Sequence, residues 1–160
     1  MVAFTGSATT AVIVLLLVRS ARDTGRAMSQ ENVEIVRLGF EAIERGDLAL
    51  LEESTLPDVV MIQPPEVPDA KTYEGPGAIR EAMEDWPAQW EDFRLDLLDI
   101  IDVSDDVVVS VTRHRGRGRE SGIEMDFEVF YVHHVPGGKL ARLEMFFSRE
   151  QALDAVGLRE

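Results

Sequence analysis

The sequence predicts an α+β fold in which a curved antiparallel sheet wraps around helices from the N-terminal half. From Phe93 to Phe147, apolar and polar residues alternate, and turn-forming residues interrupt the alternation at 104–106, 116–122 and 136–138. This pattern is typical of four consecutive strands with one face on a core. Before Phe93, apolar residues recur mostly at helical spacing. A sheet with helices on one face forms a suitable cup for a small molecule.

The composition narrows the class of partner. The 160 residues include 16 basic and 30 acidic side chains, which gives a formal net charge of -14, and no cysteine. This charge argues against nucleic acid and against an anionic membrane surface, because both attract basic proteins. Without cysteine the chain has neither a disulfide nor a thiol nucleophile, which fits the reducing cytoplasm where we expect the protein. The length of 160 residues predicts a single domain.

Residues 1–27 differ from the rest of the chain. They contain one acidic residue, three arginines and an apolar run at residues 11–18. We interpret them as an extension outside the domain of residues 28–160, with Met28 as the favoured true start. The alternatives are a membrane anchor around residues 9–18 and a cleaved signal. However, eight apolar residues are far fewer than the roughly 20 that cross a bilayer, and the arginines follow the apolar run rather than precede it.

The first predicted helix begins at Ser29 and ends at Gly46, which are typical capping residues. Its core-facing stripe consists of Val33, Val36, Phe40 and Ile43. Asp47 then caps a short second helix. We expect a strand over residues 59–63 and a short edge segment at residues 72–74.

A third helix is predicted to start at Pro76, since proline suits the first helical turn. Helical spacing places Ile79, Met83, Trp86 and Trp90 on one face of it. Because Pro87 lies inside this pattern, we expect a kink or a break there.

The strand alternation predicts which side chains face the helices. On the strand that starts near residue 107 we expect Val109, Val111 and Arg113 to face inward and His114 to face outward. The inward residues of the next two strands are expected to be Met125, Phe127, Val129, Tyr131, His133, Leu143, Met145 and Phe147. Phe130, Val132 and Phe146 would then leave an apolar outer face, which predicts a homodimer. A capped helix over residues 149–156 closes the chain.

The order of these elements and several short motifs resemble the SnoaL-like branch of the NTF2-like superfamily, which has a cone fold. The resemblance covers residues 28–158. It is carried by residues 31–36, 40–43, 46–48, 57–59, 73–75, 137–139 and 148–152. The family includes polyketide cyclases, ketosteroid isomerases, epoxide hydrolases, dehydratases and non-enzymatic members, so the resemblance implies the fold more strongly than an activity.

The sequence departs from the family where those enzymes carry their acid and base groups. The epoxide-hydrolase type resembles this chain at Arg113, but Arg115 stands where that type has an aspartate. Met145 occupies the position of the aspartate that the hydrolases and cyclases use on the last strand. A ketosteroid isomerase would need a carboxylic donor in the cavity, and none is expected there.

We predict that the cone binds a small apolar or weakly acidic molecule. The residues expected to line its cavity are Gln63, Tyr73, Trp86, Trp90, Arg113, Tyr131 and His133. His133 is the candidate general base and Tyr131 the candidate donor to an enolate oxygen. The alternatives are a solvated His133 at a strand end, tryptophans that belong to the core, and an Arg113 paired with a nearby carboxylate.

Two hypotheses therefore stand. One is a small-molecule-binding domain, with activity as a cofactor-independent isomerase, cyclase or lyase-like enzyme. The other is a non-catalytic dimeric binding or scaffold domain. We expect no cofactor and no metal, because His133 and His134 point to opposite faces of a strand and the aspartates near residue 105 lack the EF-hand spacing. The arginines of residues 113–119 are interpreted as a solvated hairpin rather than a phosphate or RNA site.

Overall fold

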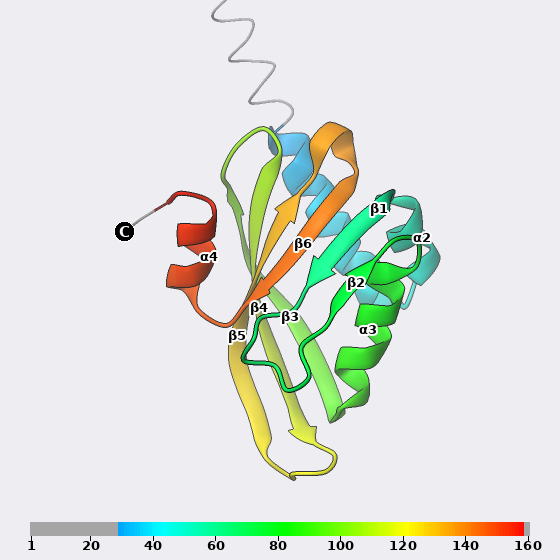
Figure 1. Cartoon of the computed structure of the whole chain (residues 1–160), viewed down its shortest axis with the longest axis vertical. Helices are drawn as coiled ribbons and strands as arrows, with labels where there is room; N and C mark the ends of the chain where they lie inside the picture. The colour runs from blue at the N-terminus through cyan, green and yellow to red at the C-terminus, as the bar shows by residue number, and fades with distance from the viewer. Residues whose placement is uncertain (1–28, 159–160) are drawn as a thin grey trace, which may run out of the picture.

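The computed structural model describes residues 29–158, which form four helices and a six-stranded sheet (Figure 1). The first helix covers residues 29–45. The others are α2 (Leu48–Glu53), α3 (Ala78–Ala88) and α4 (Arg149–Ala155). The strands are β1 (Thr55–Ile62), β2 (Thr72–Glu74), β3 (Trp90–Asp102), β4 (Val107–Gly118), β5 (Glu124–His134) and β6 (Leu140–Phe146), with a short turn of 3-10 helix, η1 (Pro136–Gly138), before β6.

The sheet has the order β2-β1-β6-β5-β4-β3. Strands β3 to β6 follow one another as antiparallel neighbours, as the alternation predicts. The sheet as a whole is mixed, because β1 pairs in parallel with β6. The α+β cone fold expected from the sequence is confirmed.

Helices cover both faces of the sheet. The first helix, α2 and α3 lie against one face, and α4 lies on the opposite side (Figure 1). The main core gathers Ile79 and Trp86 of α3 with Val129 and Tyr131 of β5 on the first face. A second core joins Ala152 of α4 to apolar residues of β4 and β5 on the other face.

The predicted caps at Gly46, Asp47 and Ser148 are confirmed. Gly46 ends the first helix with a φ of 71°, a conformation that glycine adopts without strain. The Asp47 side chain accepts a hydrogen bond from the Leu50 backbone N–H, and Ser148 accepts one from that of Gln151. These local signals fix where α2 and α4 begin.

The third helix differs from the prediction at both ends. It begins at Ala78, after a left-handed Gly77, rather than at Pro76, and it ends at Ala88. The expected break near Pro87 is therefore present, and Trp90 belongs to β3 instead of the helix. The two tryptophans nevertheless pack together, with ring centroids 5.5 Å apart.

The predicted facing of β4 is wrong by one residue. Ser110, Thr112 and His114 are fully buried on the inner face, and Arg113 points outward, where its guanidinium contacts Asp126 at 2.7 Å. The prediction failed because Val109 makes an apolar outer face that belongs to the second core under α4. The position of apolar side chains alone was therefore not enough to identify the inner face of β4.

Helix α4 also covers the outer-face residues on which the dimer prediction was based. Phe130 is 3% exposed and Val132 is 1% exposed, because both lie in the second core with Ala152 of α4. The expectation that they expose apolar surface is wrong. Homodimerisation remains a prediction without that support.

The predicted extension of residues 1–27, with its alternative of a membrane anchor, lies outside the described residues. Within residues 29–158, no helix has the length and apolar character needed to cross a membrane.

Candidate functional site

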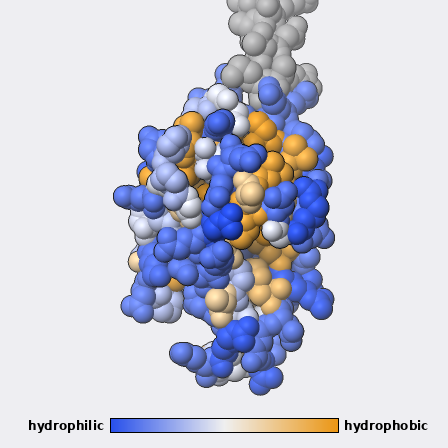
Figure 2. All heavy atoms as spheres, turned by 90° about the vertical axis from the view of Figure 1, so that its right-hand side faces the viewer, coloured by the Kyte–Doolittle hydropathy of each residue, from blue (hydrophilic) through white to orange (hydrophobic). Residues whose placement is uncertain are grey.

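A cavity of about 80 Å³ lies between the first helix, α3 and the inner face of the sheet. Its walls are mainly aliphatic, and β5 contributes Tyr131 and His133 to them. Ile35, Gly39 and Leu140 also line it and are only partly buried, so the cavity opens toward the surface beside the first helix. Figure 2 shows hydrophobic residues gathered on the helical side of the molecule between hydrophilic ones.

Tyr131 reaches the cavity because its position on β5 faces the helices. Its cross-strand partners are Ser110 on β4 and Met145 on β6. The residue is 4% exposed, and burial raises the pKa of Tyr131. The phenol therefore stays protonated at physiological pH and can donate a hydrogen bond.

His133 lies two residues further along the same face and is buried rather than solvated. Its Nε2 is 2.8 Å from the Ser110 Oγ, and the tautomer decides which of the two donates. Burial, with a smaller effect from the neighbouring His134, lowers the pKa of His133 to about 3. The ring is neutral at pH 7 but too weakly basic to take up a proton readily.

His114 is the polar residue that sequence reasoning missed, because it was assigned to the outer face. It is fully buried on β4, and the Trp86 Nε1–H donates to its Nδ1 at 3.0 Å. Burial lowers the pKa of His114 to about 4. Its Nε2 has no hydrogen-bond partner among the described residues.

A charge pattern could have placed His114 correctly. The β4–β5 register sets Arg113, Arg115 and Arg117 opposite Glu128, Asp126 and Glu124. Opposite charges stabilise directly facing positions of a sheet. Since the acidic residues were predicted to face outward, matching charges would have turned the arginines outward and His114 inward.

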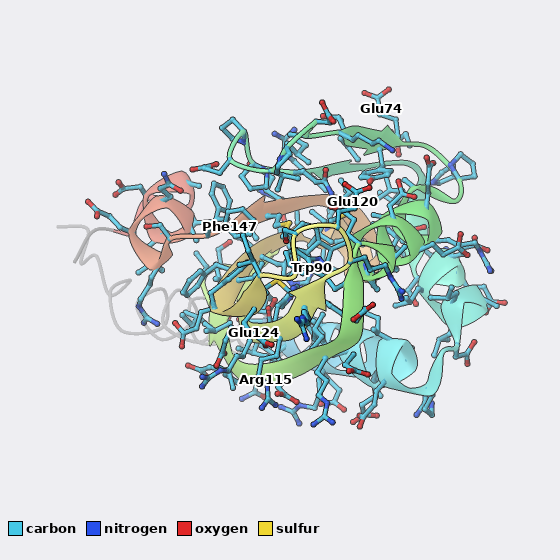
Figure 3. All side chains as sticks on the ribbon, turned by 90° about the horizontal axis from the view of Figure 1, so that it is seen from below. Glu74, Trp90, Arg115, Glu120, Glu124 and Phe147 are labelled. Atoms are coloured by element: carbon cyan, nitrogen blue, oxygen red, sulfur yellow. The ribbon has the colours of Figure 1, made fainter. Side chains whose placement is uncertain are left out.

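The two tryptophans belong to an aromatic cluster at the far end of the cone. The Trp86 ring lies 5.5 Å from Trp90, 6.3 Å from His114 and 6.4 Å from Phe147. Figure 3 shows Trp90 near the middle of this end of the molecule, with Arg115 at its edge. Neither tryptophan lines the cavity, so the alternative of core tryptophans describes the observed packing.

Three other predicted ligand residues have structural partners away from the cavity. The Gln63 Oε1 accepts a hydrogen bond from the Lys71 backbone N–H at 3.0 Å. The Tyr73 hydroxyl donates to Asp85 Oδ2 at 3.0 Å, and burial together with this carboxylate raises the pKa of Tyr73 to about 12. Arg113 is paired on the outer face, as its alternative interpretation described, so its predicted inward orientation is wrong.

Residues 36–143 match the family model described as the SnoaL-like domain, which is more than half of the chain. The chain belongs to the SnoaL-like domain family. The chain is similar to uncharacterised proteins of Mycobacterium tuberculosis and Mycobacterium bovis, with 27% identity over 78% of this chain and 94% of theirs. The resemblance drawn from the sequence is confirmed.

Solved structures share the fold. Bal32a, from a soil-derived mobile gene cassette, has a TM-score of 0.66 and 22% identity, and the match covers 81% of this chain and 98% of Bal32a. An NTF2-like protein of Burkholderia thailandensis has a TM-score of 0.66 and 25% identity, with 76% and 96% coverage. TerC, which was co-crystallised with polyporic acid, has a TM-score of 0.63 and 18% identity, with 79% and 98% coverage.

Proposed function

We propose that this SnoaL-like protein binds a small, largely apolar molecule that carries an oxygen able to accept a hydrogen bond. The observation that carries the proposal is a cavity with mainly aliphatic walls into which β5 brings Tyr131 and His133. Apolar walls contribute affinity by removing the ligand from water, and a few fixed polar groups contribute orientation. Tyr131 is the donor, because its buried phenol remains protonated.

One solved protein of similar fold was crystallised together with an added compound. TerC was co-crystallised with polyporic acid. At 18% identity the likeness concerns the fold alone, so the identity of the ligand does not transfer.

Binding is proposed ahead of catalysis because the cavity lacks an effective base. A general base works best with a pKa near the working pH, whereas the pKa of His133 is lowered to about 3. None of the described lining residues carries a carboxylate. The predicted role of His133 as a base near neutral pH therefore gives way to a role as a neutral hydrogen-bonding group.

A second candidate function rests on the pairing of Tyr131 with His133. Their ring centroids are 6.3 Å apart, and both residues line the cavity. A protonated phenol stabilises a developing enolate oxygen, so an isomerase, cyclase or lyase-like reaction would depend on Tyr131. Tyr131→Phe would then abolish turnover while leaving much of the ligand affinity intact.

The test uses two variants of Gly39, which lines the cavity from the first helix. Full-length wild type, Gly39→Ala and Gly39→Met are purified alike, and co-purifying small molecules are extracted and compared by mass spectrometry. We expect the same small molecule with wild type and Gly39→Ala, and a loss with Gly39→Met, whose side chain fills the cavity. An equal yield from all three proteins would refute the proposed site.

A further inference from the structure

His114 combines a fixed tautomer with an unused hydrogen-bond donor. The Trp86 indole N–H can only donate, so the Nδ1 that it contacts at 3.0 Å must accept. In the neutral ring the proton then resides on Nε2. That Nε2–H has no partner among residues 29–158, although the residue is fully buried.

A buried donor without an acceptor is unusual in a native protein and calls for an explanation. His114 lies in an aromatic shell, with the Phe93 ring 5.4 Å and the Tyr131 ring 6.0 Å away between centroids. Two more buried donors lack a partner in the described region. Trp90 Nε1 belongs to the same shell through Trp86, whereas the third donor is Arg115 Nε. The aromatic shell therefore contains two ring N–H donors without acceptors, and a bound ligand could supply an acceptor.

We propose that the Nε2–H of His114 recognises a neutral carbonyl oxygen, such as that of a ketone or a quinone, on the ligand that occupies the cone. The inference rests on the proposed function and names the ligand class of the same site. Two residues that line the cavity, Leu95 and Tyr131, adjoin His114. Leu95 is its register partner on β3, and Tyr131 is its ring neighbour. A ligand reaches the donor by displacing the Leu95 side chain, because His114 does not itself line the cavity.

The same geometry favours a neutral acceptor over a charged one. A carboxylate buried here would need a cationic partner, and Arg113, the cation expected in the cavity, is paired with Asp126 on the outer face. This changes the predicted ligand from a weakly acidic molecule oriented by Arg113 to a carbonyl compound oriented by His114.

Trp86 is a positioning residue in this proposal. It holds the proton on the His114 Nε2 by occupying Nδ1. Trp86→Phe keeps an aromatic ring but removes the indole N–H. It should therefore let the His114 ring sample both tautomers, which ¹⁵N NMR of the imidazole detects directly.

The test compares two probes of similar shape, cyclohexanone and methylenecyclohexane, on the full-length protein. Methyl signals of Leu140 and Leu143, which line the cavity, report occupancy by either probe. We expect both probes to shift these methyls and only cyclohexanone to move the His114 Nε2–H resonance downfield. His114→Met should weaken cyclohexanone binding about threefold to tenfold, the worth of one neutral hydrogen bond, and leave methylenecyclohexane unchanged.

His114→Gln should restore part of the ketone preference, because an amide can accept from Trp86 and donate to the ligand. His134→Gln serves as a matched control, since His134 is partly exposed and pairs with Glu144. If His114→Met does not fold, the two-probe comparison on the wild type decides alone.

Two outcomes overturn the inference separately from the proposed function. If both probes shift the leucine methyls but His114 does not respond to the ketone, the cavity binds ligands without His114. Its N–H is then explained by a contact with the Phe93 ring, whose plane makes an angle of 88° with the imidazole. If neither probe shifts the methyls, the proposed function itself fails, and the inference fails with it.

Discussion

Mild acid should destabilise this protein through His114 and His133. Burial lowers the pKa of His114 to about 4, and burial with the charge of His134 lowers the pKa of His133 to about 3. An unfolded histidine has a pKa of about 6.5. Between these values the unfolded chain binds more protons than the folded one, so the free energy of unfolding must fall as the pH drops below about 6.5.

The size of the effect follows from the same pKa values. At pH 5 an unfolded histidine is almost fully protonated, whereas both folded rings are still largely neutral. Linkage then gives a loss of about 2 kcal/mol for each residue relative to pH 8, or about 4 kcal/mol for the pair. Paired carboxylates such as Asp126, whose pKa Arg113 lowers, act in the same direction but at lower pH.

Urea unfolding followed by circular dichroism at pH 8 and pH 5 measures this loss. Wild type should lose about 4 kcal/mol between the two conditions, and His114→Gln or His133→Gln should each lose about 2 kcal/mol less. His134→Gln, at a partly exposed position, controls for the substitution itself. A pH dependence that is the same in wild type and both buried-histidine variants would refute the reasoning.

Three further predictions test other parts of the structure. Gly39→Ala should raise the free energy of unfolding by about 0.5 to 1 kcal/mol, because alanine favours the helix and its Cβ would meet only Leu51 at 3.8 Å; a decrease in urea unfolding would contradict this. Ala152→Asp should cost about 3 kcal/mol and promote self-association in sedimentation, since it buries a charge under α4, whereas Gln151→Asp at an exposed position should do neither. Arg113→Met should change the free energy of unfolding by less than about 1 kcal/mol and leave ligand affinity unaltered, because the ion pair of Arg113 is on the surface. Weaker ligand binding by this variant would show that Arg113 belongs to the binding site.

Local signals in the sequence were sufficient for the fold. Glycine at position 46, Asp47 and Ser148 marked helix ends through capping chemistry that involves only neighbouring residues. Strand β5 was assigned correctly because the charged residues in its first half, at positions 124, 126 and 128, mark the outer face. The opposite face then carries Tyr131 and His133. Both residues that line the observed cavity from this strand were therefore predicted.

The errors arose where the structure depends on distant parts of the chain. On β4 both faces carry valine, because α4 provides a second core about forty residues later. The alternation could therefore not tell Arg113 from His114. The tautomer of His114 depends on Trp86, which is 28 residues away in sequence. Trp90 was assigned to the third helix because it lies four residues after Trp86, but the chain passes from α3 to β3 between the two tryptophans.

The most direct test of the account is whether the cavity beside the first helix takes up a small apolar carbonyl compound. Cyclohexanone is titrated into full-length wild type, Gly39→Ala and Gly39→Met, and the methyl signals of Leu140 and Leu143 are followed by NMR. The account predicts saturable shifts in wild type and Gly39→Ala and none in Gly39→Met, because Gly39 lies in the cavity wall. Shifts of equal size in Gly39→Met, or no saturable shift in wild type, would contradict it.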